Sequence, residues 1–208
     1  MPLTLVALPE DTTLQQLNQL KSYYYQNGFR VKPQTCKENA HITLLELKQK
    51  IPPIFQTELR KLLAEESAIT LTKFHVFSKE HIWVSEIPHL VERFPNGCGR
   101  FTLLFPQNQK LVSLVKKIRK LALACDIDRS LEYAHRILEA TGEKKVRVNI
   151  FDYLCNHMNL CNYIHFDRVG EAKAIFEKTF HAQEIVFDNI ALVDAKHKIL
   201  RRIKLNNS

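Results

Sequence analysis

Apolar and polar residues along the chain follow strand-like and helix-like periods in turn. The run over residues 3–8 is typical of a β-strand, and Pro9 is expected to end it. Asp11 and Thr12 then offer an N-cap to a helix that stops near Gly28. The apolar face of this helix consists of Leu14, Leu17, Leu20 and Tyr24.

A second strand and a second helix are predicted next. The strand covers residues 41–47, and the prolines at 52–53 suit the first turn of the following helix. The apolar stripe of that helix consists of Phe55, Leu59, Leu62 and Leu63. Two β-type runs come after it, over 69–77 and 81–86, with 78–80 as their connection.

The second half of the chain shows a similar order of elements. Residues 109–124 form the clearest predicted helix, because apolar residues recur there at helical spacing. The other predicted elements are a strand over 100–105, an additional helix over 126–145, a long β-type run over 146–164, a helix bearing Ala172, Ile175, Phe176 and Phe180, and closing strands over 184–193 and 198–205. No low-complexity segment or flexible linker divides the chain. We therefore predict an α+β fold in one domain over residues 1–208, with two lobes that share one sheet system.

Composition places the chain among globular proteins. Of its 208 residues, 45% are hydrophobic and 25% are charged, which excludes a membrane-embedded or disordered class. No segment approaches the roughly 18 uncharged apolar residues of a membrane span, and the first ten residues do not read as a signal peptide. The cytoplasm is therefore the expected location. Reduced thiols, rather than disulfides or a zinc ribbon, are expected of the five scattered cysteines, Cys36, Cys98, Cys125, Cys155 and Cys161.

The net charge of +8 favours an anionic partner, either a nucleotide or a nucleic acid. Basic residues cluster over 116–120 and again over 196–204. Both clusters are expected to be solvated faces, because runs of charge usually are. Lys116, Lys117 and Lys120 also lie off the apolar stripe of their predicted helix, which supports this interpretation for the first cluster.

Two tetrapeptides share a pattern in which histidine is followed by an apolar, a small polar and an apolar residue. They are His41, Ile42, Thr43 and Leu44, and His157, Met158, Asn159 and Leu160. Residues i and i+2 of a strand point to the same face, so His41 is expected beside Thr43. His157 is expected beside Asn159 for the same reason. Each pair would present an imidazole and a hydrogen-bonding group to a phosphate oxygen.

On these residues the sequence resembles the 2H phosphoesterase superfamily, which includes the bacterial 2′-5′ RNA ligase-like proteins and the cyclic nucleotide phosphodiesterases. Members carry two His-x-Thr/Ser motifs, one in each lobe of a bilobal α+β fold with pseudo-equivalent lobes around a central cleft. His41 and Thr43 match the first motif fully. The second motif has Asn159 where threonine or serine is usual. The predicted helix over 126–145 is the expected insertion relative to compact members.

The resemblance implies a phosphodiesterase that needs no metal or cofactor and acts on RNA-type phosphodiesters, with a nucleotide or short RNA as its partner and no stable protein partner. His41 and His157 would be the catalytic acid and base, because histidine titrates near neutral pH. Thr43 and Asn159 would bind the phosphate oxygens. Substrate orientation would decide which histidine is the acid. A base could also stack on Tyr153 or Tyr163, although simple packing of these aromatic residues is the competing interpretation.

Other interpretations stay open. The histidines could be ordinary strand residues, and Asn159 could mark a nucleotide- or RNA-binding module with reduced turnover. A protein-interaction role would use the helix over 126–145. Zinc is disfavoured, because Cys155 and Cys161 would lie about 20 Å apart along a regular strand. The other histidines lack the paired pattern and are expected to be surface or packing residues.

Overall fold

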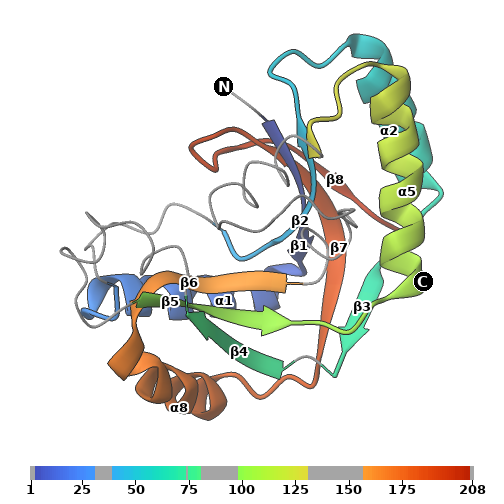
Figure 1. Ribbon diagram of the computed structural model, residues 1–208. Coiled ribbons are helices and arrows are strands. Elements are labelled where there is room, and N and C mark those ends of the chain that lie inside the picture. The colour runs from blue at the N-terminus through green and yellow to red at the C-terminus, as the bar shows by residue number, and fades with distance from the viewer. Residues whose placement is uncertain (1–2, 31–38, 74, 81–97, 131–156, 207–208) are drawn as a thin grey trace.

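The computed structural model describes residues 3–30, 39–73, 75–80, 98–130 and 157–206 (Figure 1). Their strands form one sheet of eight strands in the order β3-β7-β1-β2-β6-β5-β4, with β8 paired to β7. All of the strand pairs between named strands are antiparallel. The predicted α+β class with antiparallel strands is therefore confirmed.

The first lobe contains five strands around β1. They are β1 (Leu3–Pro9), β2 (Ile42–Leu47), β3 (Ile69–Thr72), β7 (Glu184–Val193) and β8 (Ile199–Lys204). The two helices α2 (Pro53–Ala64) and α5 (Gln109–Ala124) pack against each other and on this lobe (Figure 1). Leu5, Phe55 and Ile190 lie in the apolar layer between sheet and helices.

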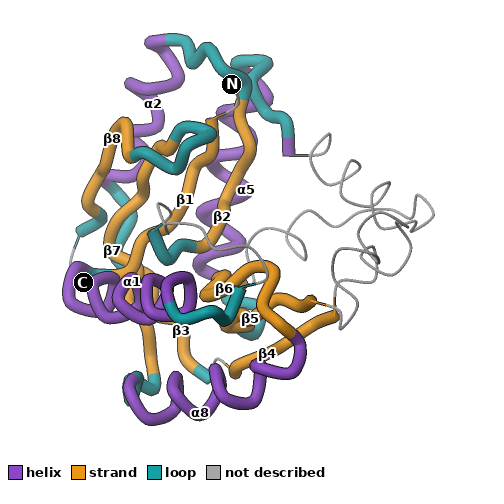
Figure 2. Tube along the Cα trace, turned by 90° about the vertical axis from the view of Figure 1, so that its left-hand side faces the viewer, coloured by secondary structure: helices purple, strands orange, loops and turns teal. Residues whose placement is uncertain are grey.

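The second lobe contains β4 (His75–Glu80), β5 (Cys98–Leu104) and β6 (His157–His165). Helix α1 (Asp11–Gln26) and helix α8 (Val169–Thr179) cover this lobe, and a 3₁₀ turn over Phe166–Arg168 leads into α8 (Figure 2). The Tyr24 ring lies edge-on to the Phe101 ring, with 5.5 Å between their centroids, and the centroids of the Phe101 and Phe176 rings are 6.4 Å apart. The Tyr24 hydroxyl donates to the carbonyl of Ala172, so α1 is tied to α8.

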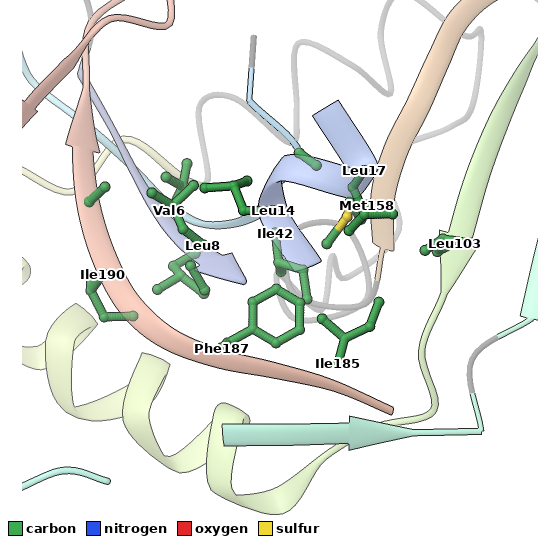
Figure 3. Close-up of a cluster of buried hydrophobic side chains, with 14 of the residues drawn as sticks. Val6, Leu8, Leu14, Leu17, Ile42, Leu103, Met158, Ile185, Phe187 and Ile190 are labelled. Atoms are coloured by element: carbon green, nitrogen blue, oxygen red, sulfur yellow. The ribbon is translucent and has the colours of Figure 1, made fainter. Parts of the chain in front are cut away.

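A continuous apolar core runs through both lobes. Figure 3 shows part of it, with Leu17 of α1 near Met158 of β6. Ile42 and Met158 are fully buried and form the pair that joins β2 to β6. The two lobes therefore meet at one point of contact in the described sheet, and we call this pair the seam.

Several predicted elements are confirmed and some boundaries are wrong. The helix over 109–124 and the strand over 184–193 are observed as predicted. The predicted N-cap is wrong, because α1 begins at Asp11 and Glu10 occupies the cap position. The strand over 69–77 is two strands, because Lys73 adopts a left-handed conformation (φ 57°) and turns the chain from one lobe to the other.

The predicted helix over 126–145 does not begin at Asp126. This residue has a positive φ of 53°, and Asp128 forms a β-bridge with Leu47. Residues 131–145 lie outside the described part of the chain, as do the predicted strand over 81–86 and most of the β-type run over 146–164. In the described part, no helix has both the length and the apolar character that crossing a membrane requires.

Candidate active site

The first motif stands where the chain enters β2. His41 is half-buried and directly precedes the strand, so the strand begins one residue later than predicted. Ile42 and Leu44 are fully buried, whereas Thr43 between them is half-buried. This alternation anchors one face in the core and leaves His41 and Thr43 on the other.

The second motif opens β6. His157 is the first residue of the strand, and both His157 and Asn159 are half-buried. Met158 and Leu160 are fully buried. On the neighbouring strand β5, Leu104 stands opposite His157 and Thr102 opposite Asn159.

The antiparallel register at the seam brings the two motifs together. Ile42 of β2 is paired with Met158 of β6. In an antiparallel pair the residue number rises on one strand as it falls on the other. The register therefore sets Thr43 beside His157 on one side of this pair and His41 beside Asn159 on the other. Paired residues of an antiparallel sheet share a face, with Cβ atoms about 4.5–5.5 Å apart. Each histidine thus lies across from the polar residue of the other motif, opposite the buried face.

The ring of His41 is held by a backbone carbonyl. Its Nδ1 lies 2.8 Å from the carbonyl oxygen of Asn39. A carbonyl oxygen can only accept, so Nδ1 carries the hydrogen and donates. In the neutral ring, Nε2 is then the nitrogen that can accept a proton, as a general base requires.

Hydrogen bonds from helix α1 hold the segment that precedes His41 in place. The side-chain amide of Asn18 donates to Oδ1 of Asn39 at 2.8 Å, and its Oδ1 accepts from the backbone N–H of Ala40 at 2.8 Å. These bonds fix the two residues before His41. The position of the first imidazole is therefore set by a helix of the other lobe.

Lys21 of α1 connects both motifs. Its side chain is 1% exposed, and Nζ donates to the carbonyl of Asn159 at 3.1 Å and to that of Asn39 at 3.5 Å. The second carbonyl is also the acceptor for His41. A buried ammonium needs such partners, since an unpaired buried charge is costly. It also places a positive charge near the seam.

Sequence reasoning missed Lys21, although a signal was present. Leu14, Leu17, Lys21 and Tyr24 follow one another at intervals of three or four residues. A lysine within the apolar stripe of an amphipathic helix indicates a buried charge with a specific partner. The partners themselves are backbone carbonyls, which the sequence does not reveal.

Asn159, which departs from the motif of the family, has an unusual environment. Among the described residues, its Oδ1 is buried and makes no hydrogen bond. A buried acceptor left without a donor costs roughly 1–3 kcal/mol. The amide therefore carries a stability cost that a smaller hydroxyl would avoid.

Tyr163 does not follow the geometry of a regular strand. The register of β6 against β5 shifts twice, so Leu160 and Tyr163 are extra residues and Tyr163 has a φ of 57°. The guanidinium of Arg30 lies 5.8 Å from the Tyr163 ring and 4.2 Å from Tyr25. Tyr163 is 37% exposed, and its role in base stacking stays a prediction. Tyr153 lies outside the described residues.

The same register shift separates Cys161 from His157. Cys161 pairs with Phe101, whereas Asn159 pairs with the adjacent residue, Thr102. Adjacent residues of a strand face opposite sides, so Cys161 faces the core and not the side that carries His157. Cys125 and Cys161 are both free thiols. Within the described ranges, no three His, Cys, Asp or Glu side chains converge as metal ligands. The lysines of the cluster over 116–120 are exposed, and Lys117 pairs with Glu66 at 2.6 Å, as expected for a solvated face.

Fold and site together define a class of protein: a two-lobed α+β chain in which two histidine motifs meet where the lobes join. Residues 7–84, which include the first motif, match the family model described as LigT like Phosphoesterase. The resemblance to the 2H phosphoesterase superfamily is confirmed by this match. No curated protein sequence matches the chain.

Similar solved structures include proteins from two bacteria. E. coli LigT complexed with 3′-AMP is 12% identical, with a TM-score of 0.49 over 99% of this chain and 98% of that chain. The protein TT0787 of Thermus thermophilus is 16% identical, with a TM-score of 0.48 over 100% of this chain and 99% of that chain. A structure described as a phosphoesterase is 13% identical, with a TM-score of 0.48 over 99% and 98% of the two chains.

Proposed function

We propose that this protein is a phosphodiesterase that cleaves RNA-type phosphodiesters without a metal ion. Its substrate would be a 2′,3′-cyclic phosphate, a 2′-5′ linkage or an RNA end. The observation that carries the proposal is the register at the seam, which sets the two motif histidines and their polar companions on one face. The phosphoesterase description of the matching family supports the same chemistry.

Hydrolysis of a 2′,3′-cyclic phosphate needs two proton transfers. One neutral imidazole accepts a proton from water as the water oxygen bonds to phosphorus. The bond from phosphorus to one ribose oxygen breaks, and an imidazolium donates its proton to that oxygen. Exchange with solvent then restores both rings. Histidine suits both steps, because its ordinary pKa near 6.5 allows either form at neutral pH.

The structure supports a definite task for each polar group. The bond from His41 to the carbonyl of Asn39 leaves Nε2 for proton transfer. The hydroxyl of Thr43 and the amide NH₂ of Asn159 would donate to the non-bridging oxygens, where negative charge accumulates in the transition state. The Lys21 ammonium would hold the backbone at both histidines and favour the anionic substrate.

The decisive experiment compares His41→Ala and His157→Ala with the parent protein on cyclic phosphates, 2′-5′ oligonucleotides and short RNAs. We expect kcat to fall at least about a hundredfold in each variant, and the rate of the parent to follow a bell-shaped pH profile. Activity should persist in EDTA. The exposed His181, which follows α8, provides the control His181→Ala with unchanged kcat. Full activity in either motif variant would overturn the proposal.

A nucleotide- or RNA-binding module with slow turnover is the second candidate. The departure at Asn159 favours it, since the amide NH₂ reaches one atom further than a threonine hydroxyl and the Oδ1 has no donor among the described residues. One misplaced donor would slow the reaction by roughly ten- to a hundredfold. A large increase in kcat for Asn159→Thr would support this candidate, and a decrease would show that asparagine serves the substrate of this protein.

A further inference from the structure

A third imidazole lies beside the candidate active site. The ring of His197, in the hairpin between β7 and β8, has its centroid 6.3 Å from that of His41, and the two planes are inclined by 29°. His197 is exposed. His197 belongs to neither histidine motif, and it lies 156 positions after His41 in the sequence (197 minus 41), so the sequence alone does not indicate that the two rings are close.

The hairpin holds His197 in a defined position. Oδ1 of Asp194 accepts from the backbone N–H groups of Lys196 and Lys198, at 2.8 and 2.9 Å. The backbone N–H of His197 donates to the Asp194 carbonyl at 2.8 Å. The bonds to the carboxylate lower the pKa of Asp194, so that it stays ionised. We call residues 194–198 the hairpin tip.

The backbone of His197 is unfavourable for a side chain of this size. Its φ is +59°, a left-handed conformation in which glycine is the usual residue and other residues are costly. A sequence selected only for the turn would be expected to place glycine or asparagine here. Backbone outliers of this kind cluster at functional sites, so the positive φ adds to the reasons for considering a role of His197 beside His41.

The hairpin tip presents positive charge to solvent. Lys196 and Lys198 are exposed on either side of His197. The one carboxylate of this segment, Asp194, faces the backbone N–H groups of the turn. An anion that approaches His41 from this side would therefore meet an imidazole flanked by two ammonium groups.

We propose that the hairpin tip binds the phosphate that neighbours the scissile one, so that the substrate is an oligonucleotide and not an isolated cyclic mononucleotide. This inference rests on the proposed function. His197 would donate to the neighbouring phosphate while His41 acts on the scissile one. Lys196 and Lys198 would add attraction that does not depend on base sequence.

The test uses His197→Gly, which removes the imidazole and suits the positive φ. The substrates are a tetranucleotide ending in a 2′,3′-cyclic phosphate and the corresponding mononucleoside 2′,3′-cyclic phosphate. We expect KM to rise by about three- to tenfold for the tetranucleotide alone, as the loss of one exposed phosphate contact implies. His181→Gly is the control and should change neither KM. An equal rise for both substrates, or none for the tetranucleotide, would overturn the inference.

A neutral linkage identifies the phosphate concerned. A tetranucleotide with a methylphosphonate next to the cyclic end lacks the charge that His197 would contact. The parent should bind it more weakly than the normal tetranucleotide, whereas His197→Gly should show a smaller difference. Equal differences in the two proteins would contradict the subsite.

Binding also separates this inference from the proposed function. If the parent cleaves neither of these substrates, the proposed action on 2′,3′-cyclic phosphates fails. Fluorescence anisotropy with the labelled tetranucleotides still measures the coupling between His197 and the neighbouring phosphate. If His197→Gly weakens binding of the normal tetranucleotide more than binding of the methylphosphonate one, the phosphate subsite is supported even without cleavage. If both are weakened equally, or neither, the subsite is rejected.

Discussion

Lys21 shows how one side chain can organise a site that it does not enter. Its ammonium bonds to carbonyls that belong to both motif segments, one before His41 and one at Asn159. A methylene chain would fill the same space but leave these carbonyls with fewer donors, and each unsatisfied buried acceptor costs roughly 1–3 kcal/mol. The residue therefore links folding stability to the alignment of the two histidines.

Lys21→Met is expected to lower the free energy of unfolding by about 1–3 kcal/mol. It should also reduce kcat more than it raises KM, because both imidazoles lose their alignment whereas only part of the attraction for the anionic substrate is lost. Urea denaturation and steady-state kinetics measure the two effects. Lys178→Met, an exposed lysine of α8, is the matched control. A variant that loses stability but keeps its kcat would show that Lys21 has only a structural role.

Asn159→Thr is expected to stabilise the fold, whatever it does to turnover. The substitution removes the buried Oδ1 that has no donor among the described residues, and a β-branched residue suits a strand. A gain of about 1 kcal/mol would raise Tm by roughly 2–4 °C in a chain of this size. Differential scanning calorimetry measures the shift. A fall in Tm would mean that the asparagine makes a contact that the threonine cannot replace.

At the scale of elements, the hydrophobic periods predicted most helices and strands. Helix α5 and strand β7 have the predicted bounds, because each has a strong, uninterrupted period. Two of the failures occur where single residues adopt positive φ. Lys73 divides one predicted strand into β3 and β4, and Asp126 keeps the chain non-helical after α5. Propensity alone does not identify these positions, since tertiary contacts decide them.

The candidate site was predictable to the same extent. The paired motifs predicted His41, His157 and their polar companions, because the strand period alone sets their faces. Lys21 and His197 were not selected, since their relation to the motifs depends on how distant elements pack. The sequence pattern does not show which backbone carbonyls Lys21 binds, and it does not show that the hairpin between β7 and β8 brings His197 back to the site.

The hairpin tip gives a prediction at this scale about pH. The pKa of Asp194 is lowered first by the hydrogen bond from the backbone of Lys198, then by that from Lys196 and by the charges of these lysines. A carboxyl whose pKa is lower in the folded state stabilises that state above its unfolded pKa, near 3.9, and this stabilisation is lost as pH falls through the lowered value. We expect the amide protons of Lys196 and Lys198 to lose protection from exchange in that acidic range.

Asp194→Ala should remove this dependence. At neutral pH the variant should exchange those two amide protons faster than the parent, while protection in the centre of β7 stays the same. Hydrogen exchange followed by NMR measures both. Unchanged protection at the hairpin tip would show that the carboxylate does not hold the turn.

At the scale of the whole molecule, the two lobes are built from segments of both halves of the chain. Helix α1 leaves the first lobe to cover the second, and α5 leaves the second lobe to cover the first (Figure 1). Within the described sheet, β2 and β6 meet in the single pair Ile42–Met158. Because each strand carries one motif, the distance between the imidazoles depends on the packing of this pair.

Ile42→Ala therefore tests whether the seam sets the geometry of catalysis. The cavity should destabilise the fold by about 2–4 kcal/mol, since Ile42 is fully buried. Leu114→Ala, on the buried face of α5, should cost a similar amount away from the seam. Measured where both variants are folded, kcat should fall roughly tenfold or more in Ile42→Ala alone, because small displacements of reacting groups are costly. Equal kcat values in the two variants would show that the pair Ile42–Met158 does not determine the alignment of the histidines.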